Sequence, residues 1–394
     1  MAGQGFNLLR LGVNWAAAEP EPGVYNRDYL TALRPLADEA GELGLIVFLD
    51  MHQDLYGQRF ADGAPDWATL TDGLPHQPGA VWSDAYLQSP AVIRALDHFW
   101  QNSPAPDGTG LQDHLAALWR EVAAVFQGSK NLLGFDLLNE PFPGSVGQEV
   151  LGAMVAAAAG EDPAAQAALL AALDDREQLL ALLVDETLFQ RILRTGAVPA
   201  GQWEQEVLSP FYEKLAAGLD GVMLLESSYF SNMGVESGLK KPSFPAIYAP
   251  HIYDLVVDTG LEGYSSHRLE TIFAAHRRVQ ERLDLPVLVG EWGAFYRQDG
   301  TAHIARQTGA LLARYGWSDA YWSWEPDLPS APCLPGLLRG YPQRVGGRLC
   351  SYSWEEGVFR MTYQSDGSPC RIWLPGRGLV ERCCPPGMAE IRVE

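Results

Sequence analysis

The chain has 394 residues, of which 47% are hydrophobic, so it can bury a substantial core and form one large domain with a smaller one. Its 49 acidic and 28 basic residues give a net charge of −21, which disfavours binding to nucleic acid and to anionic membrane surfaces and suits a neutral substrate. No apolar run approaches the roughly 18 residues that span a bilayer, and the opening MAGQGFNLLRLGV lacks the residue order of a secretory signal.

Short apolar runs recur along the chain, and polar residues and helical patterns alternate with them. This alternation is typical of buried parallel strands joined by outer helices, so we expect a (β/α)8 barrel. The seven predicted strands cover residues 7–13, 45–50, 132–138, 222–226, 246–253, 287–292 and 320–324. The predicted helices cover residues 26–43, 112–127, 267–284 and 301–315. Because a closed barrel of this kind needs eight strands, we expect that one strand–helix unit normally precedes residue 1.

Residues 148–200 interrupt the alternation with a segment rich in Ala and Leu. Apolar residues recur there near helical spacing, as at Leu179, Leu183 and Ile192, which predicts helices inserted after the third strand. Such an insertion is either an ordinary helical excursion or a cover over an apolar substrate, since the loops after barrel strands surround the active face.

The amino-acid composition changes again near residue 328, where Pro, Gly and Cys become frequent. Short alternating segments such as YSWEEGVFRMTY, PCRIWLP and AEIRV predict the hairpins of a small β-sandwich. We therefore divide the chain into a barrel domain, residues 1–330, and a C-terminal all-β domain, residues 336–394.

All the cysteines fall in the C-terminal part of the chain. Their number is odd, which leaves at least one thiol unpaired in a monomer, and no pair has the CxxC spacing of a zinc site. We expect free thiols or one or two disulfides, rather than a metal centre, among Cys333, Cys350, Cys370, Cys383 and Cys384.

Two glutamates stand at predicted strand ends. The third strand ends in Asn139-Glu140-Pro141 and the sixth in Glu291-Trp292-Gly293. Catalytic groups of such barrels lie at the C-terminal ends of strands, so both acids are expected at one cavity mouth. Hydrolysis of a glycoside needs one carboxyl group that is protonated and one that is ionised. A single Glu could equally be solvated or ion-paired, but the pair favours catalysis, with Asn139 placed to bind a sugar 2-hydroxyl.

Further polar residues follow two other strands. Asp50 and His52 close the second strand, and His251 and Tyr253 close the fifth. Strand alternation places the members of each pair on one side, so both pairs can reach the cavity. A lone His is more often structural, whereas several at strand ends on one face are better explained as partners of sugar hydroxyls and carboxylates.

Arg10 and two tryptophans complete the predicted site. Arg10, in the first strand, could lie inside the barrel and keep the nucleophile ionised, although a purely structural ion pair is nearly as good an interpretation. Trp322 and Trp324 share a face of the last strand, where an indole can stack on a pyranose ring or simply pack in the core. We favour Trp322 for the sugar.

These motifs resemble glycoside hydrolase family 5. The resemblance rests on LNEP around Glu140, GEWG around Glu291, HQD after the second strand and HIY after the fifth. More narrowly, RLGVNWAAAEPEPGVYN, FLDMHQDLYGQRF, GAPDWA and LGFDLLNEPFPG resemble the endoglycoceramidase group and its glucosylceramidase relatives. The resemblance extends over nearly all of the chain and includes Tyr341-Pro342.

The resemblance implies a retaining mechanism in which Glu140 is the acid/base and Glu291 the nucleophile. It also implies hydrolysis of the bond between glycan and ceramide in glycosphingolipids without a cofactor. We further expect a monomer without a metal ion that makes peripheral contact with lipid micelles or membranes. Secretion is implied by many bacterial relatives. Sugar-contacting positions of the family match Asn139, His251 and Trp322, and also Asp50 and His52.

One departure from the family is the absence of a counterpart to its first strand and helix, for which we expect a truncated gene model. The alternatives that keep the chemistry are an exo-acting glucosylceramidase, an endo-β-galactosidase and a β-1,4-glucanase. The contents of loops 55–110 and 140–205 decide among these. An inactive truncated glycolipid-binding relative is the alternative from another class, although both glutamates argue against it.

Overall fold

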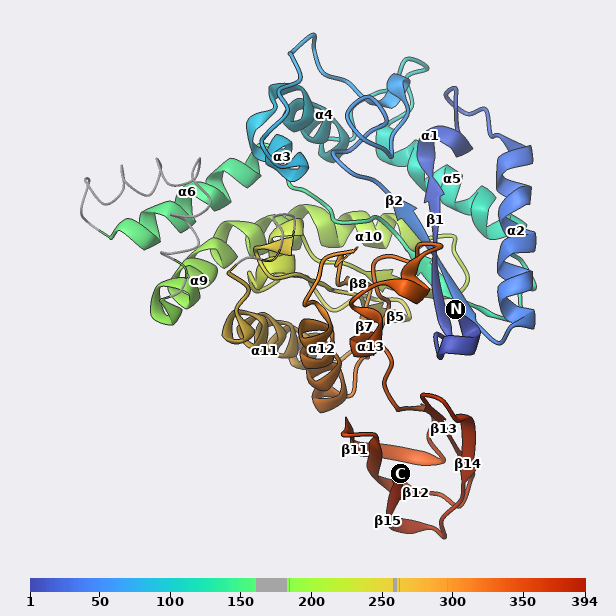
Figure 1. The fold of residues 1–394 in the computed structure, drawn as a ribbon. Coiled ribbons are helices and arrows are strands. Elements are labelled where there is room, and N and C mark those ends of the chain that lie inside the picture. Colours follow the sequence, from blue (N-terminus) through green and yellow to red (C-terminus); the bar gives the residue numbers. More distant parts are fainter. Residues whose placement is uncertain (161–182, 184, 258–260, 262, 296) are drawn as a thin grey trace.

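Seven parallel strand segments form the wall of the larger part of the protein (Figure 1). The computed structural model describes residues 1–160, 183, 185–257, 261, 263–295 and 297–394. The strands are β1 (Leu8–Asn14), β2 (Ile46–His52), β3 (Leu132–Asp136), β4 (Val222–Leu225), β5 (Ala246–Tyr248) continued by β6 (His251–Ile252), β7 (Leu288–Val289) continued by β8 (Glu291–Trp292), and β9 (Ser318–Asp319). Six of the predicted strands are therefore confirmed. The seventh, predicted at residues 320–324, is wrong in position: β9 lies just before it at Ser318–Asp319, and within the predicted range only Trp322 forms a single bridge.

The strands pair in parallel in chain order around the wall. β1 to β5 form one sheet, β6 pairs with β8, and β7 pairs with β9. Single bridges between Tyr248 and Val287 and between Gly293 and Trp322 continue the ladder. The apolar runs that predicted these strands are buried on both faces: Val47, Phe48 and Leu49 of β2 have no exposed surface.

The wall is interrupted between β1 and β9. Each of these strands pairs on one side only, β1 with β2 and β9 with β7, and none of the described residues forms a strand between them. A groove of about 910 Å³ opens at this seam, lined by residues of both strands and of the C-terminal sheets. The seven strand segments of the described residues thus form a barrel wall of the predicted α/β class, with this groove between its first and last strands.

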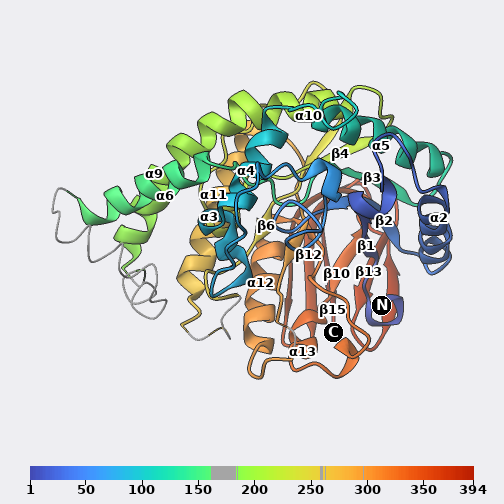
Figure 2. The same ribbon diagram turned by 90° about the horizontal axis from the view of Figure 1, so that it is seen from above.

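Helices surround the strands on the outside (Figure 2). Four match the predicted ranges: α2 (Arg27–Glu42), α5 (Leu111–Val125), α11 (Ser266–Leu283) and α12 (Ala302–Tyr315). Side-chain caps fix where two of them begin, since Asn26 accepts from the amide of Tyr29 and Ser265 from that of Arg268. Apart from the helices of the predicted insertion, the other described α-helices are α1 (Trp15–Ala18), α3 (Ala85–Gln88), α4 (Pro90–Trp100), α10 (Ser209–Ala216) and α13 (Leu334–Leu337).

The predicted insertion contains two described helices, α6 (Val146–Ala159) and α9 (Glu186–Trp203), which pack on each other and project from the barrel (Figure 1). Residues 161–182 and 184, and with them Leu179, lie outside the described part of the chain. A π-helical turn, Glu204–Leu208, joins α9 to α10. No helix among the described residues is long and apolar enough to cross a membrane.

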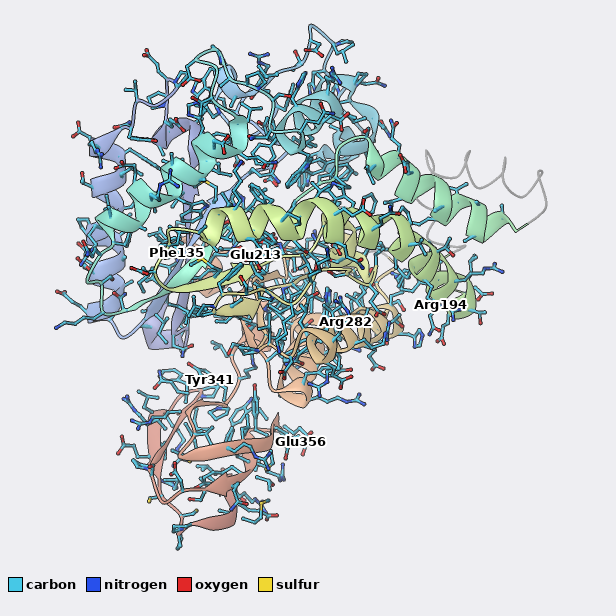
Figure 3. The ribbon with its side chains drawn as sticks, turned by 180° about the vertical axis from the view of Figure 1, so that it is seen from behind. Phe135, Arg194, Glu213, Arg282, Tyr341 and Glu356 are labelled. Carbon is cyan, nitrogen blue, oxygen red and sulfur yellow. The ribbon has the colours of Figure 1, made fainter. Side chains whose placement is uncertain are left out.

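Two three-stranded antiparallel sheets follow the barrel. One contains β10 (Tyr341–Arg344), β13 (Cys370–Leu374) and β14 (Gly378–Arg382), and the other β11 (Gly347–Glu355), β12 (Val358–Ser365) and β15 (Gly387–Val393). Tyr341 lies at the junction with the barrel (Figure 3), where its hydroxyl donates to the Gly5 carbonyl over 2.6 Å. Arg339 contacts Asp319 of β9 at the same junction. All five cysteines are free thiols.

Trp119 of α5 provides a test of the packing between helix and sheet. Its side chain is fully buried, packs edge-on against Phe135 of β3 and donates to the Leu137 carbonyl. Trp119→Ala should lower the free energy of unfolding by about 3–5 kcal/mol, because a large cavity would remain. Trp82→Ala is the control, since 42% of that side chain is exposed, and should cost under about 1 kcal/mol in urea unfolding. Equal losses would contradict this packing.

Candidate active site

Arg10 of β1 points into the barrel and is surrounded by carboxylates from four other strand ends. Its guanidinium lies 2.9 Å from Asp50, 3.0 Å from Asp136 and 2.9 Å from Glu226, and it also contacts Glu291. Only 5% of the Arg10 side chain is exposed. Burial opposes its charge, but the carboxylates outweigh burial and raise the pKa of Arg10 above its usual range. Arg10 thus lies inside the barrel in contact with Glu291, an arrangement that fits both a role in ionising the nucleophile and a structural ion pair.

The strand register explains why these groups converge. Asp50 of β2 pairs with Gly12 of β1 and with Asp136 of β3, and His251 of β6 pairs with Glu291 of β8. Each acid stands at the C-terminal end of an apolar run, where side chains can leave the packed interior and face the barrel mouth.

Glu140 is held in an uncommon backbone conformation. Its φ is 42°, in the left-handed region, which costs a non-glycine residue roughly 1–3 kcal/mol. The amide of Glu140 donates to Glu226 over 2.7 Å, and the side-chain amide of Gln53 donates to the carbonyls of Asn139 and Glu140 over 2.8 and 3.2 Å. These three buried contacts fix the direction of the Glu140 side chain.

Glu140 and Glu291 meet across His251. The imidazole Nδ1 lies 2.8 Å from Glu140 Oε1 and 3.5 Å from Glu291 Oε2, and one oxygen of each glutamate lies within 4.8 Å of the other. Retaining glycosidases hold their two carboxyl groups about 5–5.5 Å apart, whereas inverting enzymes need about 6.5–9.5 Å to admit a water molecule. The geometry is therefore that of a retaining pair.

The surroundings of the two glutamates differ in charge. Burial raises the pKa of Glu140, and His251 opposes that rise. Burial also raises the pKa of Glu291, but here both His251 and Arg10 oppose it, and the Tyr253 hydroxyl donates to Oε2 over 2.9 Å. Since only Glu291 contacts the guanidinium, it is the better placed of the two to ionise, while Glu140 can keep a proton.

The other predicted residues lie beside these charged groups. His52 Nδ1 donates to the Asp50 carboxylate over 2.7 Å, and the His52 ring stacks on Trp322 with centroids 5.2 Å apart and planes 9° from parallel. Asn139 accepts from Arg10 over 2.9 Å and donates to the Gln53 carbonyl over 2.9 Å, which leaves one hydrogen of its amide for a substrate hydroxyl. Every residue predicted for the site is thus brought to one end of the barrel.

Three residues of the site were missed by sequence reasoning. Asp136 and Glu226 are buried partners of Arg10, and each ends an apolar run, LLGFD and VMLLE, in the same way that Asp50 ends LIVFLD. That shared signal could have found them. Asn232 donates to Glu140 Oε1 over 2.6 Å, but it lies in a loop whose course no periodicity predicts.

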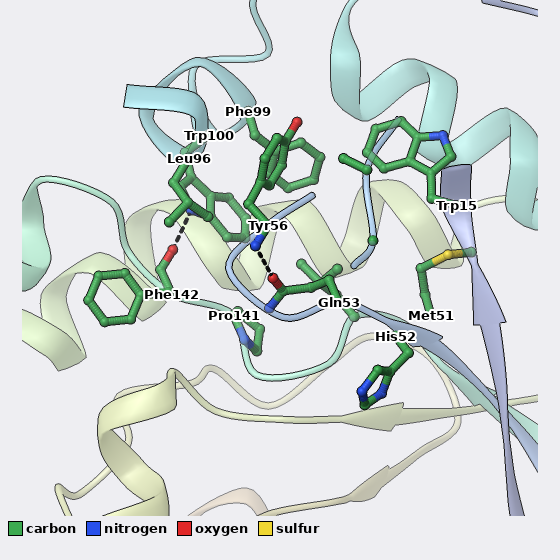
Figure 4. Close-up of a pocket in the computed structure, with 13 residues that line it drawn as sticks. Trp15, Met51, His52, Gln53, Tyr56, Leu96, Phe99, Trp100, Pro141 and Phe142 are labelled. Carbon is green, nitrogen blue, oxygen red and sulfur yellow. Dashed lines mark hydrogen bonds between the residues drawn. The ribbon is translucent and has the colours of Figure 1, made fainter. Parts of the chain in front are cut away.

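A tightly packed apolar cluster supports the loops behind the site (Figure 4). Trp100 donates to the Phe142 carbonyl over 2.7 Å, and the Tyr56 amide donates to Gln53 over 2.6 Å. The pocket between these residues has a volume of about 20 Å³, which is room for one water molecule at most. It is packing behind the catalytic loops and not a substrate site.

Groups with the spacing of metal ligands occur here among the described residues. They are His52 with Asp54 and Asp62, Glu140 with His251 and Glu291, and Asp50 with Asp136 and Glu226. In the last group Arg10 already supplies the positive charge, and in the second His251 bridges the two glutamates. The donor set therefore gives no reason to place a cation between the glutamates.

The sequence is similar to those of known glycoside hydrolases. The sequence model of the family described as "Cellulase (glycosyl hydrolase family 5)" matches residues 1–328. An endoglycoceramidase of Cyanea nozakii is 30% identical over an alignment of 165 residues that covers 36% of this chain and 32% of that protein. A glucosylceramidase of Rhizopus delemar is 28% identical over 178 residues, covering 37% of this chain and 26% of that protein. The chain thus matches only about a third or a quarter of these curated relatives.

Solved structures match over a longer span. Endo-glycoceramidase II from Rhodococcus sp., in a cellobiose-like imidazole complex, superposes with a TM-score of 0.74 at 25% identity, covering 99% of this chain and 89% of that one. The same protein in a complex with ganglioside GM3 gives a TM-score of 0.73 at 25% identity, over 98% and 89% of the two chains.

Arg10→Met tests the charge balance of the site. The variant leaves several buried carboxylates without their cation, so the free energy of unfolding should fall by about 3–5 kcal/mol at pH 7. The deficit should shrink at pH 5, because the uncompensated carboxyl groups take up protons in the folded variant. Arg277→Met, which removes an exposed pair with Glu281, should cost about 0.5 kcal/mol or less. Denaturant unfolding at both pH values measures this, and an equal effect of the two changes would contradict it.

Proposed function

The chain belongs to glycosyl hydrolase family 5, and on that basis we propose that it is a retaining endo-β-glycosidase that cleaves the bond between glycan and ceramide in glycosphingolipids. The observation that carries the proposal is the pair Glu140 and Glu291, with oxygens within 4.8 Å at one end of the barrel. Support for the substrate comes from the endoglycoceramidases among the relatives, one of which forms a complex with ganglioside GM3.

In the first step, ionised Glu291 attacks the anomeric carbon while protonated Glu140 gives its proton to the ceramide oxygen. The bond between the anomeric carbon and that oxygen breaks, ceramide leaves as the alcohol, and a covalent glycosyl-enzyme forms on Glu291. Arg10 and Tyr253, which both donate to Glu291, favour the ionised form before attack.

In the second step, Glu140 is ionised and removes a proton from water. The water oxygen attacks the anomeric carbon from the side that ceramide left, and the bond to Glu291 breaks, so two inversions give net retention. Glu140 is protonated again and the cycle can restart. The raised pKa that burial gives Glu140 suits a group that must both donate and accept a proton near neutral pH.

We assign the stacked His52 and Trp322 to one wall of the sugar site and Asn139 to the 2-hydroxyl. The ceramide leaves through the loops after the strands, where Leu74 and Trp82 expose 43% and 42% of their surface and can contact a lipid micelle or membrane. We also propose a monomer that acts outside the cell, for which the family resemblance is the support.

The function is tested by incubating the protein with glucosylceramide, lactosylceramide, a ganglioside and carboxymethylcellulose. We expect an intact oligosaccharide from the ganglioside together with free ceramide, and the β-anomer first in the NMR spectrum. Glu291→Gln should lower the rate by at least about 10⁴-fold, because the nucleophile is lost. Glu281→Gln, a change at an exposed residue of α11, is the matched control and should retain full activity.

Other outcomes on this panel identify other functions. Release of glucose from glucosylceramide alone would indicate an exo-acting glucosylceramidase, and turnover of carboxymethylcellulose alone would indicate a glucanase. Comparable rates for Glu291→Gln and the unchanged protein would contradict the assignment of the nucleophile.

The pH dependence of kcat/KM should be bell-shaped. Activity is lost at low pH as Glu291 takes up a proton and at high pH as Glu140 loses one. Because burial raises the pKa of both groups, both limbs should lie at higher pH than for exposed carboxyl groups. Glu140→Gln, assayed with an activated aryl glycoside that needs no acid, should lose the alkaline limb and keep the acidic one. An alkaline limb that persists in this variant would show that another group is the acid.

A further inference from the structure

Both hydrogen bonds to the Glu140 side chain fall on the same oxygen. Asn232 Nδ2 lies 2.6 Å from Oε1, and His251 Nδ1 lies 2.8 Å from the same atom. Within the described part of the chain, no donor is placed on Oε2. Asn232 and His251 are both buried, with 8% and 1% of their surface exposed, so water does not replace them easily.

Asn232 is held rigidly at this position. It lies in a 3₁₀ turn, Tyr229–Met233, in the connection between β4 and β5. Its backbone carbonyl accepts from the amide of Tyr253, whose hydroxyl donates to Glu291. Asn232 thus contacts Tyr253, the partner of Glu291, through its backbone, and contacts Glu140 through its side chain.

A buried carboxylate anchors the ends of the same loop. Glu204, in the π-helical turn before α10, accepts from the amide of Ser228 over 2.6 Å, from the hydroxyl of Ser237 over 2.7 Å and from the amide of Gly238. Glu204 has no exposed surface. The loop backbone is therefore fixed on both sides of Asn232, which keeps its side-chain amide within hydrogen-bonding distance of Glu140.

The two donors decide which oxygen of Glu140 can carry a proton. An oxygen that accepts from Asn232 and His251 has both lone pairs engaged, so a proton bound to it would displace a donor. His251 can change its protonation state, whereas the amide of Asn232 donates at every pH. Oε2 is left to carry the proton when Glu140 is a carboxylic acid.

We propose that Asn232 is a positioning residue that confines the transferable proton of Glu140 to Oε2 and aims it at the glycosidic oxygen. The inference rests on the proposed function, since it assigns the proton donor of that reaction to one atom. In the second step the same amide stabilises the carboxylate that receives a proton from water.

The test uses aryl β-glycosides of the glycan that the unchanged protein releases. The 2,4-dinitrophenolate group of one glycoside leaves without taking up a proton. The 4-methylphenol group of the other must be protonated as it leaves. Asn232→Ala should lower kcat/KM for the 4-methylphenyl glycoside by about 10²-fold or more, and for the 2,4-dinitrophenyl glycoside by less than about 3-fold. A structural defect would instead lower both values by the same factor.

The pH profile gives a second readout. Loss of the donor destabilises the Glu140 carboxylate, so the alkaline limb of kcat/KM for Asn232→Ala should move to higher pH by about 0.5 to 1 unit. Asn232→Asp keeps the shape of the side chain but replaces the donor with a negative charge, and should move the limb further in the same direction. Retention of covalent labelling at Glu291 by a 2-fluoro glycoside shows that each variant is folded and has its nucleophile.

These experiments distinguish a failure of the proposed function from a failure of the role proposed for Asn232. A protein that cleaves neither glycosphingolipids nor aryl glycosides overturns the proposed function together with this inference. If the unchanged protein is active, and Asn232→Ala either treats both aryl glycosides alike or keeps the original alkaline limb, the inference alone is overturned. A selective loss on the 4-methylphenyl glycoside with an upward limb shift supports it.

Discussion

One buried guanidinium holds the charges of the site together. Arg10 extends from β1 into the barrel and meets acids carried by β2, β3, β8 and the end of β4. Four acids this close would repel one another strongly in a site with little water, so their convergence depends on the cation. Arg10 is also a geometric tie, because its planar fork of donors binds acceptors in fixed directions.

Glu140 and Glu291 are both linked to Arg10, either directly or through one intervening residue. Glu291 contacts Arg10 directly, and Asn139 accepts from it. Glu226 accepts from Arg10 with one oxygen and from the Glu140 amide with the other, which helps to hold the strained backbone of Glu140. Arg10 therefore helps to position both Glu140 and Glu291. It contacts Glu291 directly and reaches Glu140 through Glu226. Their different roles follow from that difference in contact.

Much of the fold and part of the site could be predicted from the sequence. Apolar runs mark buried parallel strands, and residues at the ends of such runs, such as Asp50, Glu140 and Glu291, must gather at one end of a barrel. Alternation along β2 correctly joined Asp50 to His52. Asn232 could not be predicted, because its place depends on a loop fixed by Glu204, a residue far away in the chain. The strain at Glu140 and the stacking of His52 on Trp322 likewise arise from tertiary contacts that have no local pattern.

Because β1 pairs with a strand on one side only, its attachment to the barrel depends strongly on the side chain of Arg10. This strand is held by one hydrogen-bonded ladder, on β2, by the packing of Val13 in the core and by the ion pairs of Arg10. A strand held on one side can open without the rest of the barrel unfolding. Protonation of the acids around Arg10 weakens one of these attachments, so amide hydrogen exchange along β1 should respond to the ionisation of the site.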